Sequence, residues 1–184
     1  PEPSSFPVKE IMEVTRDVLS TKAEKALQYG TTGGVLELKE ELTKFMSKVG
    51  IKVDGPEDII ITVGSQEALD IVGRLFINPG DYIITESPTY LAALQAFRIY
   101  GPRMIGVPMD NEGIRVDVLE DTVRKIINGG GKLKFIYVVP TGQNPTGITM
   151  SEERRKALID VVNKYDLLLI EDDPYGYIYF GDDD

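Results

Sequence analysis

The sequence predicts an α/β fold built around a mostly parallel sheet. Five short runs of apolar and β-branched residues alternate with segments whose apolar residues have helical spacing. Such runs are typical of parallel strands buried on both faces, and their alternation with helices indicates right-handed βαβ units. With 184 residues and 42% hydrophobic content, the chain is long enough to bury one sizeable core.

The elements are predicted as follows. The apolar runs predict strands at 59–63, 82–85, 104–107, 135–139 and 167–170. Helical spacing predicts helices around 68–76, 118–127 and 157–162, and Ser151 is placed to cap the last of these. Ahead of the first strand, the pattern predicts two further helices around 8–14 and 35–49, separated by a loop at 28–34.

The composition excludes several kinds of chemistry. The chain has no Cys and no His, which removes disulfides, thiolate sites, Ser-His-Asp catalysis and nearly every zinc site. With 20 basic and 30 acidic residues, its net charge of −10 repels nucleic acid and anionic membranes, so neither is an expected partner. No apolar run approaches the roughly 20 residues of a membrane span. The first residues lack a secretory signal pattern, and we expect a cytoplasmic protein.

Polar residues that suit ligand binding follow the predicted strands, where open α/β sheets bind their ligands. After the first strand, Gly64, Ser65 and Gln66 form a glycine turn into a helix, whose backbone N–H groups favour an anion such as phosphate. The simpler interpretation is that Ser65 only caps the helix. After the second strand, Tyr90 can stack on a flat heterocycle or simply cover the edge of the sheet.

The last two strands are followed by an amide and by acids. Asn144 lies in a turn whose Gly and Pro residues fix its backbone, and Glu171, Asp172 and Asp173 end a buried run. Paired acids could bind Mg²⁺, but no phosphate-binding loop of the nucleotide-hydrolysing type precedes them. An Asp facing a protonated pyridine nitrogen fits better, because its charge keeps the ring protonated and makes it an electron sink.

These segments together resemble one family, the fold-type I, pyridoxal-phosphate-dependent class I and II aminotransferases. The nearest resemblance is to the 2-aminoadipate and kynurenine aminotransferase branch. The resemblance implies a three-layer fold in which helices cover both faces of the sheet, as in the large domain of aspartate aminotransferase. It covers nearly the whole chain in order and rests on Tyr29-Gly30 with Gly33-Gly34, Gly64-Ser65-Gln66, Ser87-Pro88-Thr89-Tyr90, Asn144-Pro145-Thr146-Gly147 and Asp172-Asp173-Pro174-Tyr175-Gly176.

Roles follow from this resemblance position by position. It implies that Ser65 and Gln66 hold the phosphate of pyridoxal 5′-phosphate and that Tyr90 stacks on the ring. Asp172 would pair with the pyridine nitrogen, with Glu171 and Asp173 as flanking acids. Asn144 and Tyr175 would hydrogen-bond the phenolic oxygen of the cofactor. Tyr29 would contact the partner subunit's phosphate site, which implies a homodimer. Cis peptide bonds are expected before Pro88 and Pro145.

The resemblance also predicts what the 184 residues omit. Residues 1–34 would be an N-terminal segment with an inter-subunit loop, and residues 35–184 part of the large cofactor-binding domain. The family's catalytic lysine lies in a Ser-x-Ser-Lys type motif that is missing here, so it is expected after Asp184, and no catalytic residue is assigned within this chain. The small C-terminal domain, with its substrate-binding arginine, is likewise expected beyond this point. We therefore predict one piece of a longer protein that is inactive by itself.

The predicted activity is transfer of an amino group from an amino acid to a 2-oxo acid by a ping-pong mechanism. Aminoadipate, aromatic and branched-chain amino acids are all open as donors. A pyridoxal-phosphate-dependent lyase or synthase of the same fold is one alternative, and an aminotransferase-like effector domain of a transcriptional regulator is another. The plainest alternative is an α/β domain without a cofactor, in which the loop residues serve only as turns.

Overall fold

The computed structural model describes residues 2–178. The chain divides between Thr62 and Val63 into two compact units. The first unit is helical, as its amphipathic patterns predict, and the loop predicted at 28–34 is confirmed. A short helix that the sequence did not predict lies at Ala23–Leu27 (α2). The other helices of this unit are η1 (Pro3–Ser5), α1 (Val8–Thr21), α3 (Leu36–Lys48) and η2 (Pro56–Asp58).

The strand predicted at 59–63 is not present, so this prediction was wrong. Ile59 has an extended backbone, but the N–H groups of the segment bond within the first unit, from Ile61 to the carbonyl of Gly33 at 3.1 Å and from Ile59 to the carbonyl of Pro56 at 3.2 Å. A strand exists only when a neighbouring strand completes its hydrogen bonds. The apolar run suits a strand, but no neighbouring strand pairs with it within the described residues.

The second unit contains the sheet, and the other four predicted strands are confirmed. Within the described residues it is a five-stranded sheet of order β3-β2-β1-β4-β5, in which all pairs are parallel except the antiparallel pair of β2 and β3. The two-residue β3 was not predicted, because it is too short to show a periodicity. The strands are β1 (Tyr82–Ser87), β2 (Arg103–Asp110), β3 (Gly113–Ile114), β4 (Leu133–Val138) and β5 (Leu168–Glu171).

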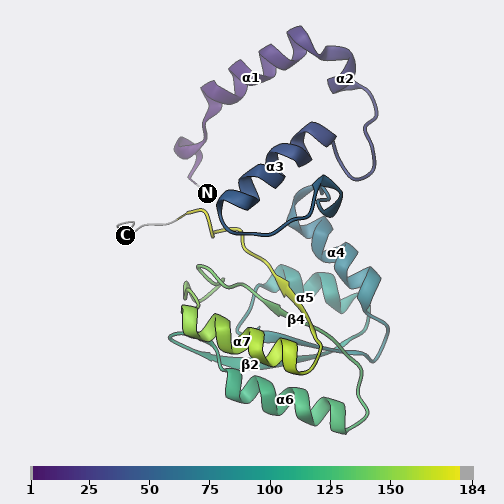
Figure 1. Ribbon diagram of the computed structural model, residues 1–184, viewed down its shortest axis with the longest axis vertical. Coiled ribbons are helices and arrows are strands. Elements are labelled where there is room, and N and C mark those ends of the chain that lie inside the picture. Colours follow the sequence, from purple (N-terminus) through teal and green to yellow (C-terminus); the bar gives the residue numbers. More distant parts are fainter. Residues whose placement is uncertain (1, 179–184) are drawn as a thin grey trace. The chain divides into compact units, whose positions relative to one another are not determined.

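Helices cover both faces of this sheet (Figure 1). One face packs against α6 (Val116–Asn128) and α7 (Glu152–Lys164), and the other against α4 (Gly64–Phe76) and α5 (Leu91–Arg98). The predicted cap of α7 is confirmed, because the Ser151 hydroxyl accepts a hydrogen bond from the backbone N–H of Arg154 at 3.2 Å.

Residues of the central strands alternate between the two faces, as the pleat requires. In β1, Ile83 packs under α4 and α5, whereas Ile84 packs under α6 and α7. In β4, Phe135 and Tyr137 belong to the first of these layers and Ile136 to the second. All five side chains have no exposed surface, which explains why the strands read as continuous apolar runs. No helix in the described part of the chain is long and apolar enough to cross a membrane.

The topology places a crevice beside β1. From β1 the chain moves to β2 on one side, and β4 lies on the other side. At such a reversal of strand order the loops after two adjacent parallel strands diverge and leave a crevice at their carboxyl ends. The loops after β1 and β4 therefore define the region in which a ligand is expected.

Candidate functional site

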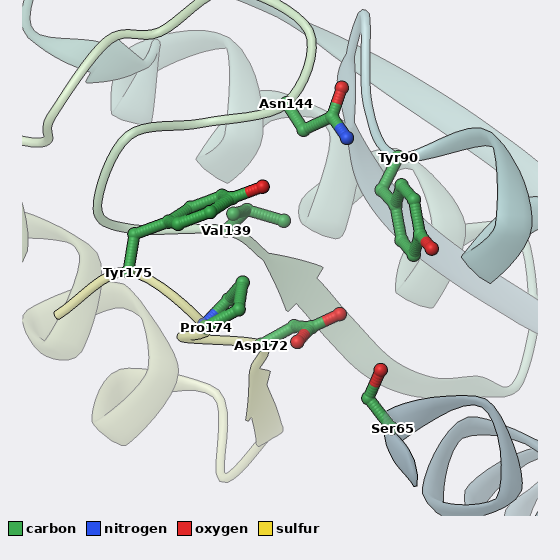
Figure 2. Close-up of a pocket in the computed structure, with 7 residues that line it drawn as sticks. All are labelled: Ser65, Tyr90, Val139, Asn144, Asp172, Pro174 and Tyr175. Atoms are coloured by element: carbon green, nitrogen blue, oxygen red, sulfur yellow. The ribbon is translucent and has the colours of Figure 1, made fainter. Parts of the chain in front are cut away.

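A pocket lies at this crevice, and it brings together five of the residues predicted from the sequence. Figure 2 shows their side chains around a common space, with the amide of Asn144, the hydroxyl of Tyr175 and the carboxylate of Asp172 directed into it. All lining residues belong to the second unit. The pocket is lined by Ser65, Tyr90, Val139, Asn144, Asp172, Pro174 and Tyr175.

The helices α4 and α5 position two of these residues. Ser65 lies in the first turn of α4, whose N-cap is Val63 and has no side-chain cap. The interpretation that Ser65 only caps the helix is therefore wrong, and its hydroxyl is directed toward the pocket (Figure 2). Tyr90 occupies the N-cap position of α5 and packs on the buried layer beneath α4 and α5. The positive ends of both helices thus point toward the crevice.

The end of β5 positions Asp172 and Tyr175. The backbone N–H of Asp172 donates to the carbonyl of Val138 at 2.9 Å, which continues the pairing of β5 with β4 by one residue. Its carboxylate oxygen Oδ2 accepts a hydrogen bond from the Tyr137 hydroxyl at 2.7 Å. The chain then turns at Pro174, and the ring of Tyr175 lies against Gly142, where an added Cβ would be 3.4 Å from its Cδ2 atom. Glycine at 142, with φ of 53°, therefore suits both the turn and this close approach.

Glu86 and Gln143 join the loops after β1 and β4, although the sequence did not single them out as site residues. Both side chains are 1% exposed. The Gln143 amide donates to Glu86 Oε2 at 3.1 Å and to the carbonyl of Pro88 at 2.8 Å. Its carbonyl oxygen accepts from the backbone N–H and the hydroxyl of Thr146, at 3.0 and 2.7 Å. One buried amide thus fixes the distance between the loops that hold Tyr90 and Asn144.

The carboxyl of Glu86 titrates near neutral pH. Burial raises its pKa from 4.5 to about 7, although hydrogen bonds from Gln143 and from the backbone of Val139 oppose the shift. Within the described part of the chain its other oxygen, Oε1, is buried without a hydrogen-bond partner. Such an atom is less costly in a neutral carboxylic acid than in a carboxylate.

Folding stability is therefore expected to depend on the protonation of Glu86. The folded state holds the Glu86 proton up to about pH 7, whereas the unfolded chain releases it near pH 4.5. The stabilisation of the folded state by this proton is therefore complete below pH 4.5 and is lost as the pH rises to about 7. The loss amounts to roughly 3 kcal/mol, at about 1.4 kcal/mol per pH unit. Urea unfolding of the cofactor-free protein at pH 4.5 and 8, compared between wild type and Glu86→Gln, measures this difference.

Other carboxylates act in the opposite direction but do not confound this comparison. The pKa of Asp81, for example, is lowered by hydrogen bonds from Asn78, so its contribution grows as the pH rises. It is present in wild type and in Glu86→Gln alike and cancels in the difference. An identical pH dependence of the two proteins would show that Glu86 is ionised in the folded state and that the account of its burial is wrong.

The loop that carries Asn144 is joined at its base to α7 by hydrogen bonds. The peptide bonds Ser87–Pro88 and Asn144–Pro145 are both cis, as predicted. Arg155 of α7 donates to the carbonyls of Met150 and Pro140, at 3.1 and 3.0 Å, and so closes the base of the loop. The Asn144 side chain is exposed at the tip of this braced loop, where a ligand can reach it.

Two predicted residues do not line the pocket. The side chain of Gln66 points from α4 to the carbonyl of Ala92, a contact of 3.5 Å. Tyr29 belongs to the first unit and is 99% exposed. The pocket-lining residues include no lysine or arginine among those that the structure describes. Glu171, Asp172 and Asp173 form no group of three acids that could hold a metal ion within residues 2–178.

Comparison with known proteins decides the family. The family model described as aminotransferase class I and II matches residues 2–184. The chain belongs to this family. Its fold agrees, since a Thermus thermophilus aspartate aminotransferase variant of 26% identity superimposes with a TM-score of 0.80, over 95% of this chain and 44% of that one. The predicted aspartate aminotransferase-like fold is thus confirmed, and the unit that contains the sheet corresponds to a fragment of the large domain of that fold.

Several members of this family are similar in both sequence and structure. An aromatic-amino-acid aminotransferase of Thermococcus litoralis is 47% identical over 98% of this chain and 43% of its own length. A 2-aminoadipate transaminase of Thermus thermophilus is 38% identical over 99% of this chain and 43% of its own length. The Pyrococcus horikoshii kynurenine aminotransferase structure, a complex with PMP, has a TM-score of 0.94 at 46% identity, covering 100% of this chain and 45% of that one. The chain thus spans less than half the length of these relatives.

Proposed function

We propose that this chain is the cofactor-binding part of a pyridoxal-phosphate-dependent aminotransferase that transfers an amino group from an amino acid to a 2-oxo acid. The observation that carries the proposal is the pocket itself. It combines a carboxylate, an amide, a serine hydroxyl and two tyrosine side chains at the topological switch point of the sheet. Kynurenine and aminoadipate aminotransferase structures superimpose on the chain as a whole with TM-scores of 0.94 and 0.89.

These groups fit the polar atoms of pyridoxal 5′-phosphate. Asp172 supplies a negative charge for the ring nitrogen, and Tyr90 supplies a flat surface for the ring. Asn144 and Tyr175 supply an N–H and an O–H that can donate to the phenolic oxygen. Ser65 supplies a hydroxyl at the positive end of α4, where a phosphate is favoured.

Gln66 is proposed to serve the same phosphate, through its backbone N–H in the first turn of α4. Its side chain faces Ala92, so the backbone is the group available from this residue. The bound cofactor supplies an electron sink for reaction at the substrate Cα atom. The residues of this chain bind and orient it, and we propose that the lysine that carries the cofactor and moves the proton is not among these 184 residues.

The arrangement of the whole enzyme is also a proposal. We infer a homodimer in which the exposed Tyr29 contacts the partner subunit's phosphate site, with residues 1–34 as the inter-subunit segment and residues 35–184 as part of the large domain. The charge of −10 argues against a nucleic-acid partner, and the lack of cysteine fits the reducing cytoplasm. Since the relatives act on aromatic amino acids, 2-aminoadipate and kynurenine, these are the amino donors to test first, ahead of the branched-chain amino acids.

The proposal is tested with the protein expressed from its complete gene and loaded with pyridoxal 5′-phosphate. Initial rates with each amino donor, at several fixed concentrations of a 2-oxo acid, should give the parallel double-reciprocal lines of a ping-pong mechanism. Cofactor binding without amino transfer to any 2-oxo acid would exclude an aminotransferase while leaving the site intact. Failure to bind the cofactor would refute the site as well.

A further inference from the structure

Tyr137 is a buried tyrosine that does not line the pocket. Its side chain has no exposed surface, and its ring meets Phe97 edge-on, with centroids 5.6 Å apart. The ring belongs to the apolar layer beneath α4 and α5, where a hydroxyl group needs a hydrogen-bond partner. The folded protein must therefore provide a hydrogen-bond acceptor for the Tyr137 hydroxyl.

That partner is the pocket carboxylate of Asp172. The Tyr137 hydroxyl donates to Asp172 Oδ2 at 2.7 Å. Tyr137 is opposite Ile170 in the pairing of β4 with β5, so Asp172, two residues further on, emerges on the same face as the tyrosine. The backbone N–H of Asp172 is meanwhile fixed by Val138. Adjacent residues of β4 thus hold both the main chain and the side chain of Asp172.

The Tyr137 hydroxyl is protonated at neutral pH and is therefore a hydrogen-bond donor. Burial, followed by the hydrogen bond to Asp172, raises the pKa of Tyr137 far above its ordinary value. The other titratable groups that act on it are Glu86 and Tyr90, and both raise its pKa further. The Tyr137 hydroxyl therefore stays protonated and remains a donor to Oδ2. The other oxygen, Oδ1, accepts no hydrogen bond within residues 2–178, and the carboxylate lies at the pocket (Figure 2).

We propose that Tyr137 is a positioning residue for the cofactor, because it holds Asp172 Oδ2 and thereby keeps Oδ1 directed at the ring nitrogen. The proposal rests on the proposed function, since it requires Asp172 to be the partner of that nitrogen. Without the hydroxyl, the carboxylate can rotate and bind water, and binding must then order it and remove that water. Preorganisation by a residue behind the pocket is the kind of support that a binding group needs.

The test is the affinity of the protein from the complete gene for pyridoxamine 5′-phosphate, which cannot bond covalently to a lysine through an aldehyde. Tyr137→Phe keeps the ring and is expected to weaken binding by about 10- to 100-fold, the range for a lost hydrogen bond to a charged group. Tyr100→Phe is the matched control, because it removes another tyrosine-to-aspartate hydrogen bond of 2.7 Å, to Asp70, away from the pocket. The proposal would be overturned if wild type and Tyr137→Phe bound the ligand with equal affinity while circular dichroism showed that both proteins are folded.

Two further measurements separate positioning from a general effect on folding. The first is the pH at which the ring nitrogen of the bound ligand loses its proton, measured from the ligand absorbance. This pH should be lower in Tyr137→Phe than in wild type or Tyr100→Phe. An unchanged or higher pH would contradict the proposal. In an Asp172→Ala background, adding Tyr137→Phe should change the affinity by less than about twofold. A large additional loss there would mean that Tyr137 does not act through Asp172. If Asp172→Ala itself leaves binding unchanged, it is the proposed function that fails.

Discussion

Replacing Asp172 with asparagine is expected to weaken the binding of pyridoxamine 5′-phosphate by about 100- to 1,000-fold, which corresponds to about 3–4 kcal/mol and to the lower part of the range for breaking a buried pair of opposite charges. The carboxylate is the negative group that lines the pocket among the described residues. It is fixed at both its backbone and its side chain, so little ordering is needed when the ring binds. Asparagine keeps the size of the side chain, but it removes the charge and replaces one acceptor oxygen with an NH2 donor. Titration of the cofactor-free protein, followed by ligand absorbance, measures the change.

The neighbouring acid provides the control for this substitution. Glu171→Gln removes one negative charge from the adjacent position, but Glu171 is exposed and does not line the pocket. Its effect should stay within about twofold, because exposed charges are screened by solvent. If both substitutions weakened binding equally, a general electrostatic effect would replace the specific role of Asp172. If neither did, Asp172 would not face the ring.

Replacing Gln143 with alanine is expected to lower the free energy of unfolding of the cofactor-free protein by about 3–5 kcal/mol. The variant loses four hydrogen bonds made by one buried side chain. It also leaves Glu86 and the carbonyl of Pro88 without this donor, and a buried group that loses its partner bears its full desolvation cost. Urea unfolding followed by circular dichroism provides the measurement.

Gln95→Ala is the matched control for this prediction. Gln95 is an exposed glutamine on α5, and its replacement by a better helix former should change stability by less than about 0.5 kcal/mol. Because Gln143 also sets the spacing of the loops that carry Tyr90 and Asn144, its loss should reduce cofactor affinity as well. A Gln143→Ala protein as stable as Gln95→Ala would show that the loops are held by other contacts.

The sequence predicted the α/β fold well because its strands and helices have different periods. Four buried runs became the parallel strands of the sheet, and Ser151 caps α7 as expected. The segment 59–63 failed for a physical reason: its apolar residues are as suitable for a strand as those of β1, but pairing is a property of two segments. Neither the antiparallel β3 nor the five-residue α2 is long enough to produce a recognisable pattern.

The pocket could be predicted only where polar residues follow buried strands. This rule located Tyr90, Asn144 and Asp172, since the carboxyl ends of parallel strands meet at one edge. Ser65 also lines the pocket, although the segment before it is not a strand. It could not locate Tyr137, whose position inside an apolar run makes it look like core. A tyrosine among otherwise apolar residues of a strand is the signal that was available, because its buried hydroxyl must have a partner.

Glu86 and Gln143 were missed for a related reason. Each stands beside turn residues, and proline and glycine in those turns account for the local composition without a buried network. The hydrogen bond from Gln143 to Glu86, of 3.1 Å, joins residues that lie 57 positions apart in the sequence. Only the topology, with β1 next to β4, brings them together.

The measurement that tests the central claim most directly is a crystal structure of the protein from its complete gene, grown with pyridoxal 5′-phosphate. We expect density for the cofactor in the pocket of Figure 2, with the ring nitrogen within hydrogen-bond distance of Asp172, the ring against Tyr90 and the phosphate at Ser65. A cofactor bound elsewhere, or bound here with its ring nitrogen directed away from Asp172, would contradict the account.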